Sequence, residues 1–251
     1  MALTLRMGLV EDLLWAGEWE EARGEIEGLL PDLEETEDLR DLLYVRASQL
    51  LLLAWRGDYS AAEALLDWVE EKGAQTEDPR AFVSCLLGAV TVRLGLGDSA
   101  RVVELLGRCS EKPSAAGGSD LVVRMPQAMR TALAVGERSL AESLLDGIEP
   151  DYPLGEHALI AARALLDEHA GRQAGAAAGF ADAAARWHGF GVPYEEAQAL
   201  LGQARCLLAL DRAPEAATVL AEAREIFARL GAAPALGEAD DLLASAGGVV
   251  S

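Results

Sequence analysis

A small residue followed four positions later by a large apolar residue recurs six times along the chain. This spacing places the two side chains on the same face of an α-helix, one turn apart. The small residue lets a neighbouring helix approach closely, and the large one fills the space beside it. The small residues are Ala22, Ala62, Val102, Ala141, Ala176 and Ala216. The large residues are Ile26, Leu66, Leu106, Leu145, Phe180 and Leu220.

A turn precedes each of these six helices. Five residues before the small position stand Gly17, Gly57, Gly97, Gly136, Gly171 and Asp211, which are spaced by 40, 40, 39, 35 and 40 residues. An apolar segment precedes each of them and predicts the first helix of a pair. Glycine readily adopts the left-handed conformation that ends a helix. Asp211 is less suited to this conformation, so the sixth turn is the weakest of the six predictions.

Proline and glycine clusters separate the pairs, because neither residue continues a helix well. They lie at Pro31-Asp32, 76–79, 112–120, 150–153, 189–193 and 231–234. The predicted boundaries are 1–32, 37–75, 79–112, 120–150, 154–190 and 193–231, with a capping helix at 234–246. A period near 40 residues indicates a single all-α domain of stacked repeats spanning 1–251, in which each pair contacts only its neighbours.

Composition narrows the classes of function. The formal charge is −21, from 21 basic and 42 acidic residues, and it disfavours binding to nucleic acid or to an anionic membrane. The acidic excess is typical of a solvated outer face. No secretory signal and no apolar run of membrane-spanning length is present, which favours a cytoplasmic location. The chain has no Asn, and arginine outnumbers lysine, a bias that points to a GC-rich bacterial source.

Few residues suggest chemistry. Phosphate-binding and dinucleotide-binding glycine motifs are absent, as is H-E-x-x-H. The three cysteines are far apart and fit small core positions. His157, His169 and His188 share no helix face, and a metal-dependent enzyme built on them is the less favoured alternative. We therefore expect no catalysis, no cofactor and no metal site.

The first helices of such pairs line the concave face of the array, which we expect to bind a protein or peptide. Trp15 and Trp55 occupy equivalent places, two residues before Gly17 and Gly57. Arginines and glutamines occupy two further sets of equivalent places. The candidate surface comprises Trp15, Trp55, Gln49, Arg130, Arg163, Gln203 and Arg205. An aromatic end and an arginine-bearing end suit an acidic peptide or helix. The alternative is that the tryptophans pack between repeats and the arginines are solvated.

The sequence G-[DE]-[YW]-x-x-A, followed by a large apolar residue, resembles the turn and second helix of the tetratricopeptide repeat. The resemblance implies a right-handed α-solenoid of about six tetratricopeptide-like helix pairs with a C-terminal capping helix. Family members often clamp a carboxyl terminus with lysine and asparagine. No first helix here carries either residue, so that clamp is absent.

Residues 186–210 (RWHGFGVPYEEAQALLGQARCLLAL) and 213–244 resemble the helical region that closes bacterial LuxR-type regulators and class III cyclase-like multidomain ATPases. The resemblance implies a module for protein interaction or ligand sensing in an ATP-dependent signalling or transcriptional regulator. An upstream ATPase module of the same polypeptide is then a possible partner. The chain ends in ASAGGVVS without a helix-turn-helix. The chain is therefore interpreted in one of three ways: as a region excised from such a regulator, as the C-terminal end of a cyclase-like parent protein, or as a stand-alone tetratricopeptide scaffold or peptide receptor.

Overall fold

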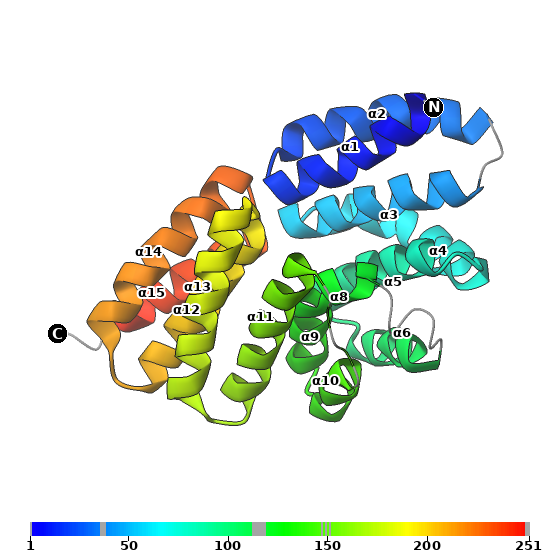
Figure 1. Ribbon diagram of the computed structural model, residues 1–251. Helices are drawn as coiled ribbons and strands as arrows, with labels where there is room; N and C mark the ends of the chain where they lie inside the picture. Colours follow the sequence, from blue (N-terminus) through cyan, green and yellow to red (C-terminus); the bar gives the residue numbers. More distant parts are fainter. Residues whose placement is uncertain are drawn as a thin grey trace.

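Every regular element in the described part of the chain is a helix, and successive helices pack against one another (Figure 1). The computed structural model describes residues 2–35, 39–111, 119–146, 148, 150 and 152–248. The helices are α1 Ala2–Ala16, α2 Trp19–Glu35, α3 Leu39–Arg56, α4 Tyr59–Gln75, α5 Pro79–Gly95, α6 Ser99–Glu111, α8 Ser119–Val123, α9 Met125–Ala134, α10 Arg138–Leu145, α11 Pro153–His169, α12 Gln173–Phe190, α13 Pro193–Ala209, α14 Ala213–Leu230 and α15 Ala233–Gly248. The prediction of an all-α fold is confirmed.

The six predicted turns all join two helices, and each has a residue with positive φ at the predicted position. Asp211 has φ 58° and is the only described non-glycine residue with positive φ. The turn that we considered weakest therefore has the same backbone conformation as the others. Gly191 and Gly231 adopt this conformation too, where α12 and α14 end.

The small residues of the repeated pattern lie at the helix crossings. All six are fully buried. Five of the six large residues are at most 2% exposed, and together they belong to one continuous core. Leu145 is the exception: it is only half-buried, because it is the last residue of the short helix α10. Ile148, one turn further along the predicted stripe, lies beyond that helix.

One predicted boundary was wrong, and one predicted helix has a break that we did not expect. Pro31 does not separate two pairs, because α2 continues through it to Glu35. Leu29 and Leu33 on either side are fully buried, and their packing offsets the hydrogen bond that proline cannot make. In the predicted repeat 120–150, the first helix is interrupted at Arg124, because Pro126 can neither donate to the carbonyl of Val122 nor fit beside it. The break at 112–120 falls mainly on residues outside the described ones.

Early helices of the array also contact late ones, and the end of α1 lies near α14 (Figure 1). Helix α1 contacts α13, and α3 contacts α15. Trp15 of α1 stacks on Trp187 of α12 with ring centroids 6.5 Å apart. The expectation that each pair contacts only its neighbours is therefore wrong for the first pairs. The accessible surface of 11286 Å² is close to the roughly 10,700 Å² expected for a compact monomer of this mass.

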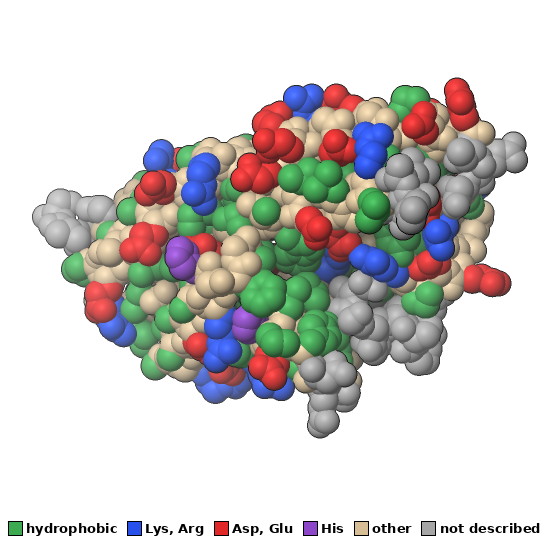
Figure 2. Space-filling model, turned by 45° about the horizontal axis from the view of Figure 1, so that its top comes forward, with side chains coloured by type: hydrophobic (Ala, Val, Ile, Leu, Met, Phe, Trp, Pro, Cys, Tyr) green, Lys and Arg blue, Asp and Glu red, His purple; other side chains and the backbone are tan. Residues whose placement is uncertain are grey.

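Charged side chains are distributed over the surface. Figure 2 shows acidic and basic side chains intermixed over the visible face. Many are paired along a single helix, as Arg23 is with Glu20 and Glu27. Pairs of this exposed kind contribute little to stability. Within the described residues, no helix has both the length and the apolar character needed to cross a bilayer.

Candidate functional site: a central cavity closed by both ends of the array

The inner helices line an open cavity of about 380 Å³. We call it the central cavity. Its wall draws on α3, α5, α9, α11, α13 and the start of α15. Representative lining residues, one from each helix in that order, are Trp55, Leu94, Arg130, Glu168, Arg205 and Glu238. Because the wall combines N-terminal and C-terminal helices, the cavity exists only while the array is closed.

An aromatic cluster closes the array beside the cavity. It consists of Trp19, Trp55, Tyr194 and Phe227. The ring centroids of Trp19 and Trp55 are 5.3 Å apart, and those of Trp55 and Tyr194 are 4.7 Å apart. Tyr194 also packs edge-on against Phe227 at 6.0 Å. Aromatic pairs in these arrangements contribute about 0.5–1.5 kcal/mol beyond their burial, so the cluster holds α2 and α3 onto α13 and α14.

A buried ion pair spans the cavity wall. Both terminal nitrogens of Arg130 donate to the Glu195 carboxylate, at 2.8 and 2.7 Å. The Glu195 side chain is 7% exposed. Burial disfavours the charged form of Arg130, but the charge and hydrogen bonds of Glu195 outweigh it and raise the pKa of Arg130. The guanidinium group therefore stays charged, and its two hydrogen bonds fix α9 against α13.

A second charged group also lines the cavity. Arg205 donates Nε and Nη2 to the two oxygens of Glu168, at 2.7 and 3.0 Å, and Nη1 to Glu238 Oε1 at 2.9 Å. Burial opposes ionisation of Arg205, but the two carboxylates raise its pKa above the usual range. This arrangement connects α11, α13 and α15 through one guanidinium group.

Helix α9 carries a polar stripe into the cavity at Gln127, Arg130 and Thr131, spaced i, i+3 and i+4. Gln127 Nε2 donates to Thr91 Oγ1 at 2.7 Å, and Thr91 in turn donates to the Leu87 carbonyl. The buried Thr131 hydroxyl donates to the backbone carbonyl of Gln127. These bonds hold the amide of Gln127 in one orientation.

The structure brings three of the seven candidate residues together. Trp55, Arg130 and Arg205 line the central cavity, so the predicted aromatic and arginine-bearing ends face the same space. Trp15 lies behind the cavity wall, with the guanidinium of Arg124 5.6 Å from its ring centroid.

The remaining candidates do not line the cavity. Gln49 accepts a hydrogen bond from Arg46 at 3.0 Å, Arg163 is exposed, and Gln203 is half-buried. The place that these three residues share in the repeat therefore does not contribute to the cavity wall.

Sequence reasoning missed the partners of the arginines. Glu168, Glu195 and Glu238 were not among the candidate residues, and the ion pairs join residues 33 to 65 positions apart. Tyr194 was also missed. Its hydroxyl accepts from Gln198 at 3.1 Å, and burial raises its pKa, so the phenol is neutral at physiological pH. The one available signal was the polar stripe in the otherwise apolar helix α9.

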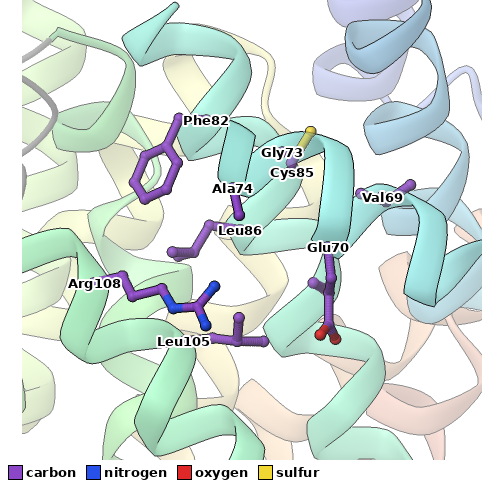
Figure 3. Close-up of a pocket in the computed structure, with 10 residues that line it drawn as sticks. Val69, Glu70, Gly73, Ala74, Phe82, Cys85, Leu86, Leu105 and Arg108 are labelled. Atoms are coloured by element: carbon purple, nitrogen blue, oxygen red, sulfur yellow. The ribbon is translucent and has the colours of Figure 1, made fainter. Parts of the chain in front are cut away.

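Two smaller cavities are poorer candidates. Figure 3 shows the first, which lies between α4, α5 and α6 and is lined by Val69, Phe82 and Leu105 among others. Its volume of about 20 Å³ leaves room for only one or two waters. The second, about 140 Å³, lies beside α1 and contains Arg124, which donates to Glu11 at 2.9 Å.

The three histidines occupy separate surroundings. His157 packs edge-on against Trp187 and Phe190, and burial, together with Arg186, lowers its pKa. His188 Nδ1 lies 3.0 Å from Glu196, and His169 borders the central cavity. No three His, Cys, Asp or Glu side chains of the described residues are placed to hold a metal ion.

Comparison with known proteins adds no family. Neither a family model nor a curated protein sequence matches this chain.

Proposed function

We propose that this chain is a binding module that holds a small molecule or a peptide side chain in the central cavity. The fold proposed is a right-handed tetratricopeptide-like solenoid of about six pairs whose ends have closed on each other. The observation that carries the proposal is the 380 Å³ cavity, with its mixed aromatic, apolar and ion-paired wall built from six helices. Binding sites for small ligands commonly combine apolar walls with a few fixed polar groups.

Ligand occupancy would be coupled to the shape of the molecule. The wall includes Trp55 from the N-terminal part and Tyr194, Arg205 and Glu238 from the C-terminal part. A ligand that contacts both parts binds the closed array better than an open one and shifts the population toward closure. In the larger role that we propose, this change regulates an attached or associated ATPase of a bacterial cytoplasmic signalling or transcriptional regulator. No reaction is assigned to the chain itself.

The cavity can be tested with a filling variant and a matched control. Ala134 lines the cavity and Ala178 lies on the exposed face of α12; both side chains are exposed. We would screen amino acids, dipeptides, nucleosides and amines by thermal shift against wild type, Ala134→Trp and Ala178→Trp. We expect some compounds to raise the melting temperature of wild type and of Ala178→Trp but not that of Ala134→Trp. A screen without such a compound contradicts it.

A further inference from the structure

The geometry points to an organic cation with an apolar body, such as an arylalkyl amine, as the ligand class of the central cavity. This inference rests on the proposed function, because it takes the central cavity as the binding site. Three features of the wall carry it: its charge balance, two unfilled acceptors and its aromatic lining.

Glu195 does not line the cavity itself, but as the partner of Arg130 it counts toward the charge balance of the wall, which is negative. Arg130 is matched by Glu195, since both of its terminal nitrogens donate to that carboxylate. Arg205 is matched by Glu168, which takes two of its hydrogen bonds. Glu238 is the third carboxylate beside two guanidinium groups, so one negative charge remains.

Glu238 also has a free oxygen. Arg205 donates to Glu238 Oε1, whereas no described residue donates to its Oε2. The side chain is half-exposed at the cavity, so this oxygen can reach a ligand there. An ammonium group is the complementary partner for a carboxylate with one uncommitted oxygen.

A second acceptor lies deeper in the wall. Gln127 is 6% exposed and lines the cavity. The hydroxyl proton of Thr91 is committed to the Leu87 carbonyl, so Thr91 Oγ1 must accept, and the Gln127 nitrogen must face it. This leaves Gln127 Oε1 as an acceptor without a donor from the described chain. Because the Gln127 side chain lines the cavity, this oxygen can accept a hydrogen bond from a ligand there.

The rest of the wall suits an apolar body. Trp55, Tyr194, Leu94, Leu133 and Leu165 line it. Aromatic rings attract cations as well as apolar groups, and the net charge of −21 raises the local concentration of cations. A neutral apolar ligand would leave Glu238 unmatched, and an anion would be repelled by it.

Three compounds of similar shape separate these cases. Phenethylamine, 2-phenylethanol and 3-phenylpropionate share a phenylalkyl body and carry a positive, zero and negative charge. Calorimetric titration of each into the full chain should show phenethylamine binding at least tenfold more tightly than the other two. Equal or tighter binding of the alcohol or the carboxylate would overturn the inference, and so would the absence of phenethylamine binding.

A pair of variants tests whether the carboxylate at the cavity is responsible. Glu238→Gln and Glu225→Gln change the net charge equally, but Glu225 is exposed on α14 and lies outside the cavity. We expect Glu238→Gln to weaken phenethylamine binding at least tenfold and Glu225→Gln to leave it unchanged, with circular-dichroism melting curves establishing that both fold. Equal weakening in both variants would show attraction by the overall charge and would refute the inference.

The inference and the proposed function can fail separately. If 2-phenylethanol binds as tightly as the amine and Ala134→Trp abolishes both, the cavity is a ligand site but not a cation site. If the wider screen finds no compound sensitive to Ala134→Trp, the proposed function fails as well.

Discussion

Gly17 lies where the first turn of the array meets its C-terminal helices, and replacing it by alanine tests that contact. A Cβ added at Gly17 would lie 2.7 Å from Pro193 Cγ and 2.7 Å from Leu230 Cδ2. Pro193 opens α13, and Leu230 ends α14. Only the closed array brings these side chains to the turn.

The expected cost has two parts. Gly17 has φ +80°, and an alanine in this conformation costs roughly 1–2 kcal/mol. The contact with Pro193 and Leu230 adds about 1–3 kcal/mol, as overpacking typically does. Gly97 is the matched control, since it has φ +78° and open space where a Cβ would lie. Gly57 is intermediate, with Pro234 atoms 3.3 Å away.

Urea unfolding followed by tryptophan fluorescence and circular dichroism measures the three variants. We expect a loss of about 2–5 kcal/mol for Gly17→Ala, about 1–2 kcal/mol for Gly97→Ala, and a value between them for Gly57→Ala. Equal losses for Gly17→Ala and Gly97→Ala would refute the contact between the first turn and the C-terminal helices.

Further predictions concern the core and the buried charges. Leu66→Ala should cost about 2–5 kcal/mol in urea unfolding because Leu66 is 1% exposed, whereas Leu145→Ala should cost clearly less because Leu145 is half-buried; equal costs would contradict the packing. Glu70 is buried and accepts hydrogen bonds from two arginines. Glu70→Ala should therefore lower the free energy of unfolding by about 3 kcal/mol, near the lower end for a broken buried ion pair. A loss under about 0.5 kcal/mol would show that these ion pairs are dispensable. Burial raises the pKa of the Cys85 and Cys206 thiols to about 12, so peptide mass spectrometry should find neither alkylated by iodoacetamide at pH 8 before urea is added, and labelling of the folded protein at either would show that it is accessible.

The repeated pattern of a turn residue, a small residue and a large apolar residue predicted the positions of most helices and turns. A turn glycine followed by a small and then a large residue predicted six turns, and it did so even at Asp211, whose side chain suits positive φ poorly. It failed at Pro31 and Pro126, because a proline's effect depends on what its helix packs against. The pattern failed at Leu145 because the predicted apolar stripe extends beyond the end of the short helix α10.

The closure and the cavity could not be read from the same pattern. Trp15 and Trp187 are far apart in the sequence, as are Arg130 and Glu195, and the curvature that joins them is set by many small helix-packing angles. Arg130 and Arg205 hold the same place in their repeats and both line the cavity, whereas Trp15 holds the place of Trp55 but does not line it. The carboxylate partners of the two arginines follow no repeat spacing and had no comparable signal.

Small-angle X-ray scattering of the monomer tests most directly whether the array closes on itself. A compact chain of 251 residues has a radius of gyration of about 18 Å, and the closed array predicts a value near this with a symmetric distribution of interatomic distances. A radius several ångströms larger, with a long tail in that distribution, would mean an open array without the central cavity and would contradict the account.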